Sequence, residues 1–363
     1  MENGASANTL DGIGHYTKSL QQFLRLAPDI EVLPYRFDSG SACNAGTQNV
    51  GLFQRQALIA LIARRAFKGF SAFGDEGIDL IHATDHLVPK SHDYPVIATL
   101  MDVIPLSHPQ WVDYRFKRLN NAAWRASFRW ADRIITISEY SKSQIIKYIG
   151  VPESVVDVIP LGVDEEWFTE RDPELIAAAQ ARYRLPQTYL LFVGTLQPRK
   201  NVSALIRAHE RLPPRVRQTH PLVIIGRYGW GSEALLSKLK ENANANVKWL
   251  KYVPHNDLQC LMAGATGFIF PSLLEGFGLP VLEAFAAGVP VAAAQTSSIP
   301  EVAGDAAILF DPESEEAIAS AMTRLVEDVD LRASLSARGR ERARGFSWEQ
   351  TAIKTIETYK AVL

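Results

Sequence analysis

Short apolar runs rich in β-branched residues alternate along the chain with longer segments of helical periodicity. A strand buried on both faces, as in a parallel sheet, is typically a short continuous apolar run, and a helix separates it from the next strand. The pattern therefore predicts an α/β fold with parallel sheets. The runs that we interpret as strands are residues 30–37, 78–84, 95–103, 133–138, 156–163, 189–194, 221–226, 246–253, 267–272, 289–294 and 306–310.

A charged segment near the middle of the chain divides these strands into two sets. We expect two doubly wound, Rossmann-like domains at residues 1–165 and 186–345, joined by a linker at 166–185 that carries a short helix. A last helix at 346–363 has Ser347 as its predicted N-cap. Ligands of such sheets bind beyond the carboxyl ends of the strands, so two domains that face each other would form a cleft.

The stretch DGIGHYT, Asp11 to Thr17, is expected to be a glycine loop that leads into the first helix. The residues before it are too polar for a buried strand. Either the sheet starts with a later strand, or a first strand precedes the printed sequence, and we favour the second interpretation. Gly12 and Gly14 would let an anionic group approach the helix, or they form a plain turn.

Charge, cysteine content and hydropathy indicate which partners and which cellular compartment the sequence favours. The chain has 363 residues, 47% of them hydrophobic, and a net charge of -2, so no overall basic charge attracts nucleic acid. Its two cysteines, Cys43 and Cys260, lack metal-ligand spacing and favour a reducing compartment. No secretory signal and no apolar run of membrane-spanning length occur, which predicts a cytoplasmic location.

The stretch PSLLEGFGLPVLEAFAAGVPVAA, residues 271–293, carries two glutamates around a glycine-rich apolar segment. Pro280 and Gly288 predict a helix at about 280–287. The free N–H groups at its start, near residues 277–281, form an anion site, and Glu275 and Glu283 can accept hydrogen bonds from hydroxyl groups. This combination suits a sugar attached to a phosphate. The alternative is that Glu283 complements the helix dipole and Glu275 is a turn acid.

Two basic residues, Arg199 and Lys200, follow the strand at 189–194 and precede a predicted helix. In that position they can bind a phosphate group. The alternative is a solvated loop.

Five stretches in this order resemble the retaining glycosyltransferases of family GT4, which have the GT-B fold. They are DGIGHYT, ADRIITISEYSKSQII with VIPLGVD, LFVGTLQPRKN, the E-x7-E segment at 271–293, and SSIPEVAGDAAILFDP. The resemblance covers nearly the whole chain. It implies a metal-independent hexosyltransferase without a cofactor, whose donor is a nucleoside-diphosphate sugar and whose last helix returns to the N-terminal domain.

The resemblance also implies roles for single residues. Glu275 would accept from hydroxyl groups of the donor sugar, and Glu283 from the ribose. Lys200, with Arg199, would contact the diphosphate as negative charge develops on it. The remaining donor contacts would be the backbone N–H groups of Phe277, Gly278 and Leu279, the glycines Gly12 and Gly14, and, near the nucleobase, Arg227, Tyr252 and Val253. For the last three, exposed loop residues without a ligand are the alternative.

Two positions depart from the family pattern. Many relatives have His-Asp where this chain has Met101 and Asp102, and methionine cannot donate or shuttle a proton. The histidine role is therefore absent, or His82, His86 or His108 supplies it, and Asp102 is a candidate catalytic residue. Thr195 replaces a second basic residue of some members, but the form VGTLQPRKN resembles mannosyltransferases of polysaccharide assembly and favours GDP-mannose.

A basic stretch with interleaved tryptophans runs from residue 111 to 133. Such a helix can lie on an anionic membrane, but we favour an ordinary amphipathic helix with its tryptophans in the core. Acceptors in the family are often lipid-linked glycans, which would suit attachment at the inner face of a membrane. The residues concerned are Arg115, Lys117, Arg118, Arg125, Arg129 and Arg133 with Trp111, Trp124 and Trp130.

The sequence therefore indicates transfer of a hexose, with mannose favoured, from a nucleotide sugar to a glycan hydroxyl group. One alternative is an epimerase, a phosphorylase or a UDP-sugar-dependent transferase of similar fold. Another is a non-catalytic relative that binds a sugar nucleotide; intact Glu275, Lys200 and Glu283 argue against it.

Overall fold

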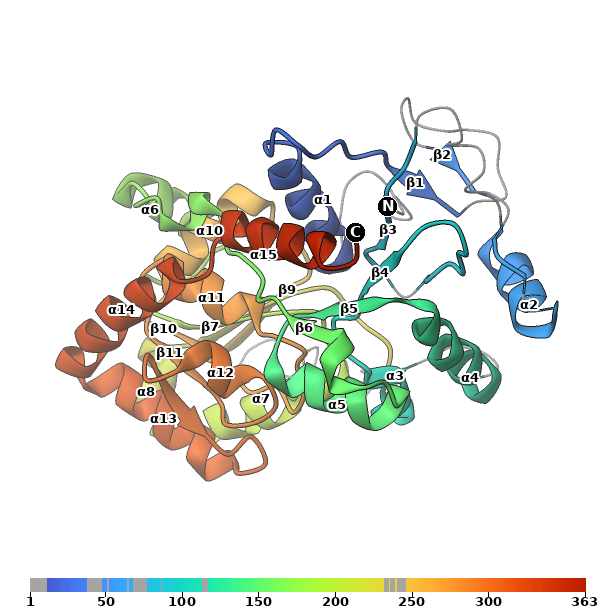
Figure 1. Cartoon of the computed structure of the whole chain (residues 1–363). Coiled ribbons are helices and arrows are strands. Elements are labelled where there is room, and N and C mark those ends of the chain that lie inside the picture. The colour runs from blue at the N-terminus through green and yellow to red at the C-terminus, as the bar shows by residue number, and fades with distance from the viewer. Residues whose placement is uncertain are drawn as a thin grey trace. The chain divides into compact units, whose positions relative to one another are not determined.

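The computed structural model forms two compact units, the first made of Met1–Gly162 and Trp348–Leu363 and the second of Val163–Ser347. Figure 1 shows the helices and strands of both units along the chain. The residues that the structure describes are 12–37, 48–50, 52–63, 65–67, 77–85, 87–112, 117–231, 235, 239 and 246–363.

The first unit holds a four-stranded parallel sheet in the order β3-β4-β5-β6, with β3 Ile81–Ala83, β4 Val96–Thr99, β5 Arg133–Thr136 and β6 Val156–Val158. A separate parallel pair consists of β1 Tyr35–Arg36 and β2 Gln48–Asn49. The helices of this unit are α1 Gly12–Leu24, α2 Phe53–Ala63, α3 Ile104–Ser107, α4 Lys117–Ser127, α5 Glu139–Ile149 and α15 Trp348–Lys360, with 3-10 turns at Pro109–Trp111, Phe128–Trp130 and Glu153–Val155.

The second unit holds a six-stranded parallel sheet in the order β12-β11-β10-β7-β8-β9. Its strands are β7 Leu190–Val193, β8 Leu222–Ile225, β9 Val247–Leu250, β10 Gly267–Phe270, β11 Val291–Ala294 and β12 Ala307–Phe310. Its helices are α6 Pro173–Arg182, α7 Val202–Arg211, α8 Pro214–Thr219, α10 His255–Ala263, α11 Leu279–Ala286, α12 Ile299–Ala303, α13 Glu315–Glu327 and α14 Val329–Arg344, with 3-10 turns at Glu165–Phe168 and Pro198–Lys200.

The predicted α/β class with parallel sheets is confirmed. Each of the predicted apolar runs contains a strand, although the strands are shorter than the runs; residues 30–37, for example, contain only Tyr35–Arg36. The short strand Gln48–Asn49 was not predicted, because it is polar. The described residues contain no helix that is long and apolar enough to cross a membrane.

The predicted glycine loop is wrong for residues 12–17, which form the first turns of α1. Asp11 lies outside the described residues. Tyr16, Leu20 and Leu24 are buried at a spacing of four residues, so the apolar face of a helix outweighs the low helix propensity of the glycines. This face packs in the first unit against α15, where the Tyr16 ring lies 6.2 Å from Trp348.

Strand order in the second unit creates the feature that positions the site. From the neighbouring strands β7 and β10, the chain continues outward in opposite directions, to β8 and β9 on one side and to β11 and β12 on the other. Such a switch point leaves a crevice at the carboxyl ends of the two strands, where loops can diverge around a ligand. The loops that follow β7 and β10 carry Lys200 and Glu275.

Candidate active site

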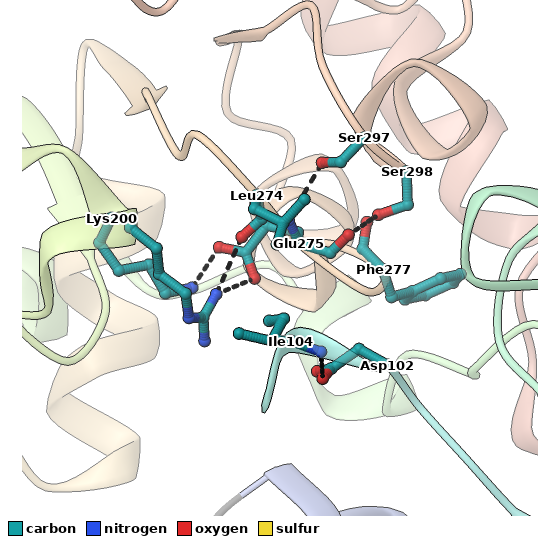
Figure 2. A network of polar contacts seen from close by, with 9 residues as sticks. Asp102, Ile104, Lys200, Leu274, Glu275, Phe277, Ser297 and Ser298 are labelled. Carbon is teal, nitrogen blue, oxygen red and sulfur yellow. Dashed lines mark hydrogen bonds and ion pairs between the residues drawn. The ribbon is translucent and has the colours of Figure 1, made fainter. Parts of the chain in front are cut away.

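A buried cluster of two cations and one carboxylate lies at this switch point (Figure 2). Lys200 Nζ donates to Glu275 Oε1 at 2.5 Å, and Arg199 Nη1 donates to Glu275 Oε2 at 2.7 Å and to the carbonyl of Leu274 at 3.1 Å. The side chains of Lys200 and Glu275 are each 9% exposed, and that of Arg199 is 21% exposed. The structure thus joins the basic pair and the glutamate that the sequence analysis had selected in separate stretches.

The loop after β7 brings the cations to this place. The Lys200 ammonium lies 4.9 Å from the centroid of Phe270, the last residue of β10, in a cation–π contact. The backbone also links the two loops, because the Leu273 amide donates to the carbonyl of Arg199 at 2.8 Å. Lys200 is therefore held against the last residue of β10, and Arg199 against the loop between β10 and Glu275.

Glycines let the strand ends approach each other closely. A Cβ atom on Gly226, after β8, would lie 1.9 Å from the carbonyl oxygen of Gly194, after β7. Only glycine fits at such a separation. The close approach of Gly194, in the loop that leads to Lys200, therefore requires glycine at position 226.

The electrostatics of the cluster follow from its burial. Burial alone would raise the pKa of Glu275, but Lys200 and Arg199 lower it to about 2. Burial lowers the pKa of Lys200, and Arg199 acts in the same direction, while the carboxylate of Glu275 opposes both. The site consequently holds an ionised carboxylate that can only accept hydrogen bonds, beside two donors.

Two serines hold the backbone around Glu275, and the sequence analysis missed both of their roles. Ser297 Oγ accepts from the Glu275 amide at 3.0 Å, and Ser298 Oγ lies 3.0 Å from the carbonyl of Glu275 and 2.8 Å from that of Phe277 (Figure 2). Both serines follow β11, the neighbour of β10. Two adjacent serines, three and four residues after the end of a buried strand, were the available signal.

The start of α11 presents unused backbone donors. Within the described part of the chain, the backbone amides of Phe277, Gly278 and Leu279 donate no hydrogen bond. The sequence predicted free amides as far as Val281. That prediction is wrong for Val281, because its amide donates to the Gly278 carbonyl at 2.9 Å. Three successive amides at a helix N-terminus that have no acceptor among the described residues can donate to oxygen atoms of a ligand.

The predicted helix around Glu283 is confirmed, since α11 spans Leu279–Ala286 and Gly288 follows it with a φ of 74°. Glu283 is half-buried in its second turn. Among the predicted nucleobase contacts, Arg227 and Tyr252 lie together, with the guanidinium 5.5 Å from the centroid of the ring. Val253 is buried, so its side chain offers little surface to a ligand.

In the first unit, Asp102 Oδ1 accepts from the Ile104 amide at 3.0 Å (Figure 2). His82 is held by two hydroxyl groups, that of Tyr359 at 2.7 Å from Nδ1 and that of Thr99 at 2.8 Å from Nε2. Burial lowers the pKa of His82 to about 3. These contacts make His82 a neutral link between β3, β4 and α15.

The remaining candidates of the sequence analysis are the other histidines, the two glycines and the basic stretch. His108 stacks on Trp111 with ring centroids 4.5 Å apart, and His86 lies outside the described residues, as does Arg115 of the basic stretch. Gly12 and Gly14 lie in the first turn of α1. Trp124 of α4 and Trp130 of the following 3-10 turn pack on the hydrophobic core of the unit, as expected, whereas Trp111 stacks on His108 and is not among the residues of that core.

Comparison with known proteins connects these features to two protein families. The family described as "Glycosyl transferases group 1" matches residues 177–342, and that described as "Glycosyltransferase Family 4" matches residues 14–167. The O-antigen chain mannosyltransferase B of Escherichia coli is 31% identical over 378 residues, covering 97% of this chain and 96% of that protein.

Two further proteins are similar to the chain. The serotype-specific mannosyltransferase WbdA of Escherichia coli is 29% identical over 306 residues; the match covers 81% of this chain and only 36% of WbdA. The structure of Anabaena HepE in complex with UDP and glucose aligns with a TM-score of 0.75 at 18% identity, covering 98% of both chains. At that identity the likeness concerns the fold alone.

Proposed function

The chain belongs to glycosyltransferase family 4 and is a hexosyltransferase of the GT-B fold, and we propose that it transfers mannose from GDP-mannose to a glycan hydroxyl group with retention of configuration. One observation carries the proposal of a donor site. An ionised Glu275, two cations and three amides without an acceptor among the described residues lie on loops that follow adjacent parallel strands.

We assign each group according to its chemistry. Glu275 accepts hydrogen bonds from the sugar hydroxyls, which donate to a carboxylate that has no proton of its own. The amides of Phe277, Gly278 and Leu279 donate to sugar and phosphate oxygens. When the bond to the sugar breaks, negative charge grows on the leaving diphosphate, and Lys200 and Arg199 stabilise it. Glu283, in α11, accepts from the ribose.

The proposal also names mannose as the sugar and guanosine as the nucleoside of the donor. The similarity to two enzymes named as mannosyltransferases supports mannose, and the first of them matches along nearly its whole length. The O-antigen relative also supports a glycan acceptor that belongs to surface polysaccharide assembly. We place the nucleobase beside the Arg227–Tyr252 pair, where an aromatic ring and a guanidinium are both exposed.

Thermal unfolding with a panel of GDP-, UDP- and ADP-sugars tests the donor. A ligand that binds only the folded protein stabilises it by about 2.7 kcal/mol when present at 100 times its dissociation constant. We expect GDP-mannose to raise Tm more than UDP-glucose or ADP-glucose does. If only UDP-sugars stabilise the protein, the donor is a UDP-sugar and not GDP-mannose. Retention is tested separately, by NMR of the anomeric proton of the product.

A further inference from the structure

Two loops of the second unit are hydrogen-bonded to each other beyond the ends of their strands. The β7 loop, residues 194–200, carries the two cations of the cluster, and the β8 loop, residues 226–231, carries Arg227. The Leu196 amide donates to the Arg227 carbonyl at 2.8 Å, and the Gly229 amide donates to the Leu196 carbonyl at 2.9 Å. The parallel pairing of β7 with β8 therefore continues into both loops.

Glycines of the β8 loop lie where the two loops touch. A Cβ atom on Gly229 would lie 2.6 Å from the carbonyl oxygen of Leu196 and 2.7 Å from Cγ of Gln197. A Cβ atom on Gly231 would lie 3.1 Å from Cγ of Pro198, in the 3-10 turn that carries both cations. Backbone approaches backbone at position 229, so a side chain there would push the loops apart.

The other side of the β8 loop is held by β9, the edge strand of the sheet. Trp249 Nε1 donates to the Gly226 carbonyl at 2.9 Å, and the Gly226 amide donates to the Leu250 carbonyl at 2.9 Å. Gly226 directly precedes Arg227, whose guanidinium lies over the ring of Tyr252. The indole N–H of Trp249 therefore fixes the backbone next to the Arg227–Tyr252 pair.

The β7 loop is anchored more strongly than the β8 loop. Lys200 of the β7 loop is ion-paired with Glu275. The Leu273 amide also donates to the carbonyl of Arg199. Arg227 of the β8 loop, in contrast, is exposed. A side chain added between the loops is therefore expected to displace the β8 loop and to leave the cations in place.

We propose that Gly229 and Trp249 are positioning residues of the donor site, which set the distance between the groups that bind the diphosphate and those that bind the nucleobase. Gly229 allows the loops to touch, and Trp249 holds the β8 loop from its other side. Because a nucleoside diphosphate has to engage both loops at once, their spacing determines how tightly the whole nucleotide binds. Both roles rest on the proposed function, since they require that a nucleotide binds at this site.

Calorimetric titration with GDP, UDP and inorganic pyrophosphate tests these roles. Pyrophosphate can engage the cations but not the groups that bind the nucleobase. In Trp249→Phe, the affinity for the nucleoside diphosphate that the wild type prefers is expected to fall about fivefold, as for the loss of one hydrogen bond. Gly229→Ala is expected to lose at least as much. The affinity of both variants for pyrophosphate is expected to stay unchanged.

Steady-state release of GDP from GDP-mannose provides a second measurement. The contact with the nucleobase is the same before and during bond breaking, so its loss weakens binding of the ground state and of the transition state equally. Both variants are therefore expected to raise KM about fivefold and to leave kcat unchanged.

Gly264→Ala is the matched control. A Cβ atom at this position would lie 2.7 Å from Cγ2 of Ile176, so the variant also forces a close contact in the second unit, but one that involves neither loop. It is expected to lower Tm and to leave nucleotide affinity unchanged. Combination with Arg227→Ser gives a further check. Loss of the Arg227 side chain should weaken nucleotide binding less in Gly229→Ala than in the wild type, because the loop is already displaced.

Three outcomes overturn the two roles and leave the donor site standing. They are equal losses for nucleotide and pyrophosphate, nucleotide binding as tight as that of the wild type in both variants, and a loss in Gly264→Ala as large as that in Gly229→Ala. A wild type that binds neither GDP nor UDP overturns the donor site itself, and the two roles with it.

Discussion

Lys200 Nζ lies 2.5 Å from Oε1 of Glu275, and both side chains are buried. Each ion therefore compensates the charge of the other in a place that water hardly reaches. Removing one partner of such a pair leaves an uncompensated buried charge, which typically costs about 3–5 kcal/mol. The residues that we assign to donor binding are thus also residues on which the stability of the second unit depends.

Replacement of Glu275 by alanine is expected to affect both properties. Transfer is lost because the sugar hydroxyls lose their acceptor, and the free energy of unfolding falls by about 3 kcal/mol because Lys200 loses its counterion. Glu275→Gln keeps the shape of the side chain and one carbonyl acceptor, so it is expected to unfold at a higher urea concentration than the alanine variant. Urea unfolding and release of nucleoside diphosphate from the donor measure the two effects; an active Glu275→Ala enzyme would contradict the assignment.

A double-mutant cycle isolates the ion pair. Lys200→Met and Glu275→Gln are each expected to destabilise the protein, whereas the double variant buries no uncompensated charge from this pair. We expect an interaction energy of about 1–3 kcal/mol between the two positions, from urea unfolding of all four proteins. Additive losses would mean that the two side chains do not stabilise each other. Arg215→Met, at an exposed position, serves as the control.

Gly278 precedes α11 with a φ of 121°, a conformation that side chains rarely allow, and a Cβ atom there would lie 2.7 Å from Cδ1 of Ile299. Gly278→Ala is expected to cost about 1–3 kcal/mol and to weaken donor binding, because it displaces the amides at the start of the helix. Adding Ile299→Val removes the clash but leaves the backbone strain, so only part of the stability should return. Full recovery would show that strain contributes nothing.

Acid is expected to destabilise the first unit through His82. The unfolded imidazole takes up a proton below its ordinary pKa of 6.5, whereas the folded one does so only near its lowered pKa of about 3. Between these values the unfolded state binds more protons, so stability falls as pH falls, by at most about 1.4 kcal/mol per pH unit.

The corresponding experiment compares urea unfolding of wild type and His82→Gln at pH 7 and pH 5. The stability difference between the two pH values should shrink by up to about 2 kcal/mol in the variant. His92→Gln, at an exposed position, should leave that difference unchanged. Equal pH dependence of wild type and His82→Gln would contradict a neutral, buried His82.

The sequence predicted the strands well because a parallel strand is buried on both faces and therefore consists of a continuous run of apolar residues. Gln48–Asn49 was missed because its pairing with Tyr35–Arg36 depends on neighbours and not on an apolar run. Gly12 and Gly14 were interpreted as a loop, because local propensity does not reveal that Tyr16 and Leu20 are buried.

The site residues were found by motif, but their relation was not. Lys200 and Glu275 are 75 positions apart, and they meet because β10 pairs directly with β7. Strand order is a property of the whole sheet, so no local pattern could predict this ion pair. The same holds for Ser298, which reaches the Glu275 loop from the strand next to β10.

Release of GDP from GDP-mannose, measured for wild type and Glu275→Gln, tests the central claim most directly. We predict that the wild type consumes GDP-mannose faster than UDP-glucose or ADP-glucose. We also predict that the variant loses at least about 100-fold in rate, because the uncharged amide is a weaker acceptor for the sugar hydroxyls and no longer compensates the charges of Lys200 and Arg199, which stabilise the leaving diphosphate. A wild type that consumes none of these sugars, or a variant as fast as the wild type, would contradict it.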